Sequence, residues 1–261
     1  MKVSIYQHFR KHEHPFVDQV LSWKEQVERT YISYLTDFLD PRERQMIRSI
    51  IGPTNEEVKY SFFGGANEAE RQRGVIAPFY EEMIENDFQI MLLEGTFANK
   101  FNQLKHRDIL GAFLSLGIDR KKIGDILIDE NRFQIVVTQE LSPYIKMNLT
   151  KIKNARVQLV EQSLSNMLHK KDEWMTSNHT VSSLRLDIIV KEIYRMSRKD
   201  AAQHIRNHRV KVNFKNVDDP SVQIIVDDLI SVRGYGRSKL IAIHGKTRKE
   251  KIKITTARLK T

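Results

Sequence analysis

Cysteine is absent from this chain of 261 residues, which excludes disulfide bonds and thiolate zinc sites. No apolar run approaches the roughly 18 residues of a membrane-spanning helix, and residues 1–8 lack the apolar core of a secretory signal. Glycine numbers only 11, and neither the dinucleotide-binding nor the P-loop spacing of glycines occurs. We therefore expect a cytoplasmic protein without membrane contact and without a metal or nucleotide cofactor.

Apolar residues are plentiful enough for folded domains. They make up 40% of the chain and include 12 Phe and 8 Tyr, so the chain can form packed cores and extensive disorder is not expected. Its length suits two or three small domains.

Basic residues are distributed unevenly along the chain. The net charge is +10; residues 181–261 hold 19 Lys and Arg against 8 Asp and Glu, whereas residues 1–180 hold 24 against 25. Clustered Lys and Arg neutralise phosphates and release counterions, so the last third is expected to bind a polyanion such as RNA. The alternative is a basic surface that is only solvated.

Residues 1–85 are expected to form an N-terminal α/β domain. Apolar residues recur at helical spacing over 15–31, with a proline at the first helical position. The run Asp40-Pro41-Arg42-Glu43 has the pattern of a second helix start, in which Asp40 caps the helix and the Glu43 side chain reaches back to the backbone N–H of the capping residue. Alternating apolar residues then predict a strand over 58–63 that stops at a glycine pair.

Residues 86–162 show the order strand, helix, strand, strand, helix, strand. The expected elements are, in chain order, 88–93, 106–116, 125–128, 132–137, 141–149 and 157–160. This order is that of the split βαβ, ferredoxin-like fold, and it makes the protein α+β overall.

Several RNA-binding domains share this ferredoxin-like (RRM-like) topology, but topology alone does not establish function. The aromatic signature of an RNA-recognition motif is absent from the third strand, and Phe133 by itself does not form a stacking platform. Direct RNA contact and a protein-docking or spacer role both remain open for this domain.

Residues 163–181 are polar and lack a clear period, so we interpret them as a linker. In residues 182–261, a stripe from Leu186 to Ile193 predicts one short helix, and Ser197 caps a second. The expected strands that follow are 210–212, 222–226, 230–232 and an edge strand with a basic face at 251–254.

One set of residues spans these two expected helices and the strands after them, and it includes basic residues that we expect to be exposed. It consists of Arg185-Leu186-Asp187, Ser197-Arg198, Ala201, Ile205, Val210-Lys211-Val212-Asn213 and Asp228-Leu229-Ile230-Ser231-Val232-Arg233-Gly234. This pattern resembles the S4 RNA-binding domain, which implies two helices beside a small β-sheet. Where that family usually places Gly before the first strand, this chain has Asn207-His208, and Asn tolerates the left-handed conformation.

Motifs outside this segment carry a second, narrower resemblance. They are Tyr6-Gln7-His8-Phe9-Arg10, His14-Pro15-Phe16, Leu35 to Glu43, Phe62-Phe63-Gly64-Gly65, His106 to Gly111 and Gly124-Asp125-Ile126. Together they resemble the YlmH family of bacterial S4-domain proteins, over essentially the whole chain. The resemblance implies a ribosome-associated quality control factor that binds rRNA of the large ribosomal subunit and peptidyl-tRNA in rescue of stalled nascent chains, and we expect a monomer.

Eight residues are the candidate RNA contacts. Arg185 and Arg198 are carried over from the family's RNA-facing positions, and the others are Lys199, Arg206, Lys211, Asn213, Arg233 and Arg237. They are expected to contact phosphate and sugar more than base edges. Reversing the charge of Arg185 and Arg198 is expected to weaken RNA binding and to leave thermal stability nearly unchanged.

An enzyme and a protein adaptor are the competing classes. Arg185-Leu186-Asp187 is similar to the catalytic motif of pseudouridine synthases, but it lies at a helix start, where Asp187 is expected to cap or to pair. Arg195-Met196-Ser197-Arg198-Lys199 is only superficially like a tyrosyl-tRNA synthetase loop, so we expect no catalytic activity. The near-neutral residues 1–180 leave a cell-division adaptor, acting through protein contacts, as the alternative.

Overall fold

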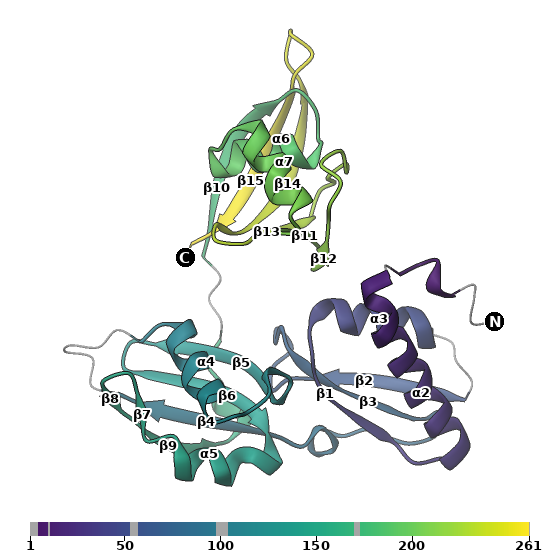
Figure 1. Ribbon diagram of the computed structural model, residues 1–261, viewed down its shortest axis with the longest axis vertical. Coiled ribbons are helices and arrows are strands. Elements are labelled where there is room, and N and C mark those ends of the chain that lie inside the picture. The colour runs from purple at the N-terminus through teal and green to yellow at the C-terminus, as the bar shows by residue number, and fades with distance from the viewer. Residues whose placement is uncertain (1–4, 10, 53–56, 98–103, 170–172, 261) are drawn as a thin grey trace. The chain divides into compact units, whose positions relative to one another are not determined.

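The computed structural model describes residues 5–9, 11–52, 57–97, 104–169 and 173–260. The chain divides into two compact units, Met1–Lys170 and Lys171–Thr261 (Figure 1). The fold is α+β, as predicted, with antiparallel sheets in both units. The two domains expected over 1–85 and 86–162 therefore lie in one unit, and the third forms the other.

The N-terminal domain is a three-stranded sheet with two helices on one face. The strands are β1 (Tyr34–Leu39), β2 (Val58–Phe63) and β3 (Gln72–Pro78), in the order β1-β3-β2. Helices α2 (His14–Thr30) and α3 (Pro41–Ile51), preceded by a 3-10 turn η1 (Lys11–Glu13), bury their apolar stripes against it. The helix starts lie where the sequence predicts them, because proline occupies the first turn of both.

The start of α3 confirms the predicted capping pattern. The Glu43 backbone N–H donates to Asp40 Oδ1 at 2.8 Å, and the Asp40 N–H donates to Glu43 Oε2 at 2.7 Å. Two N–H groups that the helix leaves without intrahelical partners are thus satisfied, so the helix begins sharply at Pro41.

The central domain has the predicted ferredoxin-like topology. Its elements are β4 (Ile90–Thr96), α4 (His106–Ser115), β5 (Ile123–Asp129), β6 (Arg132–Thr138), α5 (Ser142–Asn148) and β9 (Gln158–Gln162). The strand order β5-β6-β4-β9 places the third strand of the motif beside the first. Short elements complete it: η2 (Glu85–Phe88), η3 (Arg120–Lys122), η4 (Gln139–Leu141), the pair β7 (Lys151–Ile152) and β8 (Ala155–Arg156), and η5 (Leu164–Asn166). Both α-helices pack on one face of the sheet.

The other face of the central sheet is buried as well. Leu92 and Val136 from this face join Phe38 and Val75 of the N-terminal domain in one apolar cluster. Gln134 is fully buried there and hydrogen-bonds the backbone of residues 166 and 168. An RNA-recognition motif binds bases on this face, so that mode of binding is blocked here.

Polar contacts also connect the two domains. The Asp125 carboxylate accepts the backbone N–H groups of Glu70 at 2.7 Å and of Arg71 at 3.0 Å. The buried guanidinium of Arg73 on β3 donates to the Thr36 carbonyl of its own domain and to the Phe88 carbonyl of the central domain. The bonds to Asp125 and Phe88 thus connect the two domains within one compact unit.

Replacing Asp125 with Ala is expected to lower the free energy of unfolding by about 1–3 kcal/mol, because two partly buried N–H groups lose their acceptor. Chemical denaturation of the full chain measures this change. Asp129→Ala is the matched control, since Asp129 is on the same strand and half-exposed. Equal losses in the two variants would contradict the structural role of Asp125.

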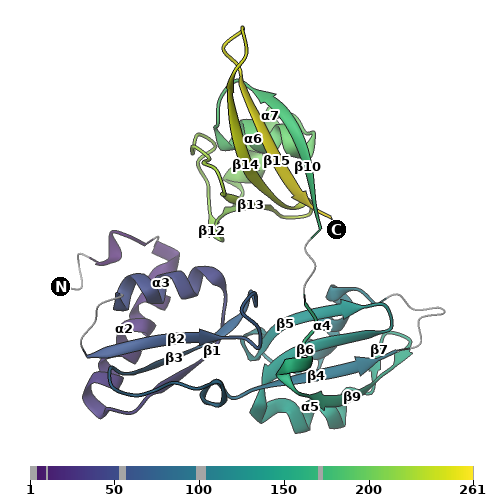
Figure 2. The same cartoon turned by 180° about the vertical axis from the view of Figure 1, so that it is seen from behind.

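The second unit is a six-stranded sheet with two helices on one face (Figures 1 and 2). Its elements are β10 (Trp174–Val181), α6 (Leu186–Tyr194), α7 (Arg198–Arg206), β11 (Val210–Val212), β12 (Lys215–Asn216), β13 (Leu229–Val232), β14 (Gly236–Lys246) and β15 (Ile252–Leu259). The strand order is β10-β15-β14-β13-β11-β12. The two helices predicted from the apolar pattern are confirmed, and they are the arrangement expected of an S4 domain.

Three sequence predictions are wrong in this region. The linker expected over 163–181 contains a strand, because β10 pairs along its whole length with β15, and Met167 is buried against the central domain. Residues 222–226 form no strand; Gln223 makes only one isolated bridge, to Arg185. The expected edge strand at 251–254 is instead interior, since β15 pairs with β10 on one side and β14 on the other.

Candidate nucleic-acid interface

The site begins at the N-terminus of α6, which a distant loop holds in place. The Leu186 N–H donates to the Val222 carbonyl at 2.8 Å, and the Asp187 N–H donates to the Pro220 carbonyl at 3.1 Å. These carbonyls satisfy N–H groups that a helix start otherwise leaves unpaired. The loop after β12 is thereby fixed beside the first turn of α6.

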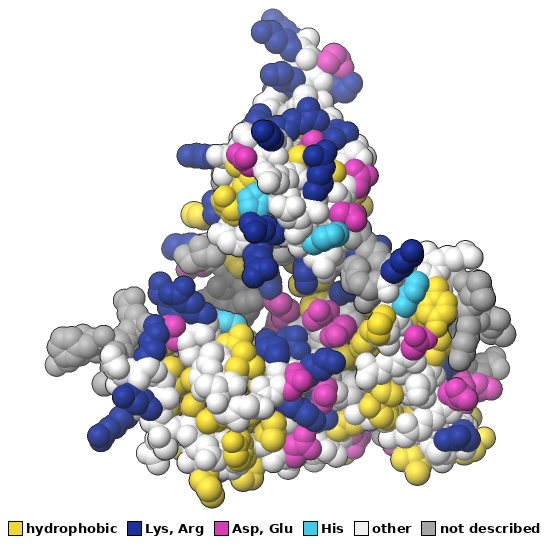
Figure 3. Space-filling view, viewed as in Figure 1, with side chains coloured by type: hydrophobic (Ala, Val, Ile, Leu, Met, Phe, Trp, Pro, Cys, Tyr) yellow, Lys and Arg dark blue, Asp and Glu magenta, His cyan; other side chains and the backbone are white. Residues whose placement is uncertain are grey.

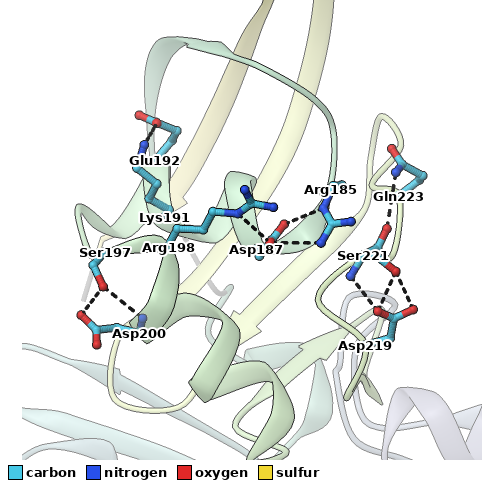
Figure 4. A network of polar contacts seen from close by, with 10 residues as sticks. All are labelled: Arg185, Asp187, Lys191, Glu192, Ser197, Arg198, Asp200, Asp219, Ser221 and Gln223. Carbon is cyan, nitrogen blue, oxygen red and sulfur yellow. Dashed lines mark hydrogen bonds and ion pairs between the residues drawn. The ribbon is translucent and has the colours of Figure 1, made fainter.

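Asp187 lies between two arginines (Figure 4). Arg185 binds both of its carboxylate oxygens, at 3.1 and 3.2 Å, and Arg198 Nε binds Oδ2 at 3.0 Å. Asp187 is only 3% exposed. Burial by itself raises the pKa of Asp187, but hydrogen bonds from the two arginines outweigh it, so the pKa lies below its ordinary value. The carboxylate therefore stays ionised and orients both guanidinium groups.

Helix α7 supplies the other cations. Ser197 caps it by accepting the Asp200 N–H at 3.1 Å, as the sequence predicts. Ala201 is fully buried against the core, which turns Lys199 and Arg206 toward solvent. The apolar spacing of the helix thus determines which basic side chains are exposed.

Four of the eight predicted residues line one hollow of about 490 Å³. Its walls are Arg185, Asp187, Arg198, Lys199, Ala202, Arg206, Asp219 and Pro220. Four cations thus face two carboxylates, one of which both arginines already share. A concave surface with this charge is suited to bind phosphate groups of a nucleic acid backbone.

Ala202, Asp219 and Pro220 also line the hollow, although they were not predicted from the sequence. The sequence predicts that Ala202 packs between the two helices. In the structure it lines the hollow, and its small side chain leaves the hollow open. Asp219 and Pro220 lie more than 30 positions from Arg185 in the chain, and no local period places them at the start of α6. Only the backbone bonds of their loop to that helix bring them there.

The other predicted residues lie outside this hollow. Lys211 is exposed on β11, and Arg233 is exposed at the turn between β13 and β14, where its N–H donates to the Arg209 carbonyl. The Arg237 guanidinium stacks over the Phe214 ring, with 5.9 Å between them. The eight residues therefore do not form one continuous site.

The side-chain amide of Asn213 is engaged in hydrogen bonds within the protein. Its Nδ2 donates to Asp228 Oδ1 at 2.7 Å, and its Oδ1 accepts the Leu229 N–H at 2.9 Å. Its backbone is left-handed, with φ of 48°, which Asn tolerates better than most residues. The turn after β11 explains this asparagine, so the structure does not support its prediction as an RNA contact.

Basic side chains continue from the helices to the hairpin of β14 and β15. Lys and Arg are abundant on the visible face of this unit and at the hairpin tip (Figure 3). At the tip Lys246 pairs with Glu250 at 2.6 Å, while Arg248, Lys249 and Lys251 are exposed. The unit thus carries the charge excess on more than one surface.

Metal ligands do not cluster in the described residues: nowhere in that part of the chain do three His, Cys, Asp or Glu side chains come together as a metal site. The described helices also include none that is long and apolar enough to cross a membrane.

Comparisons with known proteins agree with this arrangement. Residues 12–81 match the family model described as "YlmH, N-terminal", and residues 84–166 match "Putative RNA-binding domain in YlmH". The chain is similar to a solved structure, "Cell division protein ylmH from Streptococcus pneumoniae", with 33% identity and a TM-score of 0.55. That similarity covers 63% of this chain and 99% of the other.

A curated relative is similar over almost the full length. "Ribosome-associated protein quality control protein P2" of Bacillus subtilis is 39% identical over 256 residues, which are 98% of this chain and 99% of the relative. Because identity at this level extends over both units, the chain belongs to the YlmH family.

Proposed function

We propose that this chain is a non-catalytic protein that binds structured RNA through the hollow formed by α6, α7 and the loop after β12. The observation that carries the proposal is the convergence of Arg185, Arg198, Lys199 and Arg206 on one concave surface. Guanidinium and ammonium groups so placed bind phosphates of adjacent nucleotides and recognise the shape of the RNA more than its sequence.

The RNA that we propose is rRNA of the large ribosomal subunit together with peptidyl-tRNA. The name of the Bacillus subtilis relative, a ribosome-associated quality control protein, supports this choice. In this proposal the protein acts in the cytoplasm as a monomer and helps to rescue stalled nascent chains. The net charge of +10 favours association with so large a polyanion.

Two features support binding rather than catalysis. Asp187, the residue most similar to a catalytic aspartate, is buried and hydrogen-bonded to two arginines, so its oxygens are not available to a substrate. Both faces of the central sheet are covered, which supports placing the principal RNA contacts of this proposal in the C-terminal unit.

Sedimentation with purified bacterial ribosomal subunits tests the proposal. The full chain is expected to sediment with large subunits but not with small ones, and to be released as salt rises, because phosphate contacts are salt-sensitive. Arg29→Glu with Lys121→Glu is a control that reverses two exposed charges of the other unit, and it should bind normally. Absence of the chain from both subunits at low salt would contradict ribosome binding.

A cell-division adaptor is the second candidate, favoured by the name of the similar Streptococcus pneumoniae protein. It would act through protein contacts of the first unit, whose charge is near neutral. Failure of the chain to bind either subunit, with unchanged binding to a division protein, would favour it.

A further inference from the structure

Large apolar side chains are exposed together at one end of the N-terminal domain. Their exposed fractions are 67% for Tyr31, 67% for Ile32, 59% for Phe79 and 60% for Tyr80. Single exposed apolar residues are common on soluble proteins, but a group that includes three aromatic rings marks an interaction surface. We call these four residues the aromatic patch.

The fold brings the two halves of the aromatic patch together. β1 pairs with β3 in antiparallel register, Tyr34 opposite Ile76, so continuing this register places residues 31 and 32 opposite residues 78 and 79. The Ser33 hydroxyl donates to Glu81 Oε2 at 2.6 Å and fastens the end of α2 to the segment after β3. The Phe79 and Tyr80 rings lie edge to face, with centroids 5.3 Å apart.

The aromatic patch is not part of either core of its domain. One face of the β1-β3-β2 sheet is covered by α2 and α3, and the other packs on the central domain. Tyr31 ends α2 in the left-handed conformation, with φ of 56°, and lies beyond both layers. Exposure of the patch is therefore not explained by packing within the described part of this unit.

The charge of the segment that follows β3 differs from that of the RNA site. The segment from Phe79 to Phe88 contains four acids, Glu81, Glu82, Glu85 and Asp87, and no Lys or Arg. Glu82 and Glu85 are exposed. Carboxylates repel phosphates, so aromatic rings in this setting are poorly suited to stack on RNA bases.

We propose that the aromatic patch binds a protein segment that combines apolar and basic side chains. Exposed aromatic residues supply most of the binding energy at protein interfaces, and an acidic rim selects a basic partner and speeds its association. The aromatic patch lies in the first unit and the RNA-binding hollow in the second, so the two sites share no residue.

Fluorescence anisotropy with a labelled peptide of alternating Lys and Leu, added to the full chain, tests the proposal. Phe79→Ser with Tyr80→Ser is expected to weaken binding about tenfold or more, because the rings are its central contacts. Glu82→Gln with Glu85→Gln is expected to weaken it several-fold and to flatten its salt dependence. Met147→Ser with Ile225→Ser removes two exposed apolar residues elsewhere and should have no effect.

A peptide of alternating Glu and Leu should bind at least tenfold more weakly than the Lys peptide. Equal binding of both peptides, or equal affinity in the patch variants, would overturn the proposal. Displacement of the peptide by single-stranded RNA in an Arg185→Lys, Lys199→Glu, Arg206→Glu background would show an RNA site instead. Concentration-dependent dimerisation lost in the Phe79→Ser, Tyr80→Ser variant would show that a second copy of the chain occupies the patch.

Discussion

Reversing Lys199 and Arg206 together, as Lys199→Glu with Arg206→Glu, is expected to weaken binding of structured RNA about 100-fold at moderate salt. Both side chains line the hollow, and both are exposed on α7. Each lost phosphate contact also reduces the dependence of affinity on salt, so the slope of log affinity against log salt should fall by about 2. Filter binding with bulk tRNA at several salt concentrations measures both quantities.

The thermal midpoint of this variant should stay close to that of the native chain, because exposed charges contribute little to folding. The Arg29→Glu, Lys121→Glu variant changes net charge by the same amount and should bind tRNA nearly as tightly as the native chain. A similar loss in the two variants would mean that net charge, and not the hollow, determines RNA affinity.

Reversing Arg185 and Arg198 is expected to have the larger effect on stability, contrary to the expectation from sequence. Both arginines neutralise Asp187, which is buried, so the double glutamate variant leaves a buried carboxylate beside two new ones. Because the two arginines are themselves partly exposed, we expect the loss of their hydrogen bonds to the buried carboxylate to cost about 1–3 kcal/mol. The C-terminal unit should therefore unfold at least about 5 °C lower in differential scanning calorimetry.

The pH dependence of this effect follows from the lowered pKa of Asp187. In the native chain the folded-state pKa lies below the unfolded value, so the ion cluster stabilises the fold above roughly pH 4 and loses this contribution as pH falls through the folded pKa. The double glutamate variant should raise the pKa of Asp187 and gain relative stability on acidification. Denaturant titrations at pH 7 and pH 4 measure this difference.

The conservative change Arg185→Lys with Arg198→Lys keeps both charges and should retain most of the stability. Lys199→Glu with Arg206→Glu provides the second comparison, because it reverses two charges on the same hollow without touching Asp187. If both double reversals lowered the melting temperature equally, the buried ion cluster would not be the cause.

Local patterns in the sequence were sufficient for the helices and for the central topology. Proline, a capping acid and a glutamate at the right spacing determine the start of α3 whatever surrounds it. Short apolar runs on either side of a turn predict β5 and β6, because a strand that is buried on both faces is apolar along most of its length. The exposed basic face of α7 follows in the same way from its buried Ala201 and Ile205.

Strand neighbours could not be predicted in this way. β10 is polar along most of its length, so its period gives no signal, yet it completes the sheet by pairing with β15 some 80 residues away. The same pairing makes β15 an interior strand, although its alternating Lys and Ile residues are typical of an edge. Backbone pairing between distant segments leaves little trace in either segment's composition.

The family resemblance, the charge of the last third and the exposed basic residues of α6 and α7 can all be inferred without the structure. How these residues act depends on the folded arrangement. Folding places Asp187 between Arg185 and Arg198 and engages the side-chain amide of Asn213 in a hydrogen bond to Asp228. It also buries the face of the central sheet on which an RNA-recognition motif would bind bases. Periodicity describes one element at a time, whereas ion pairs, hollows and covered faces depend on residues that only folding brings together.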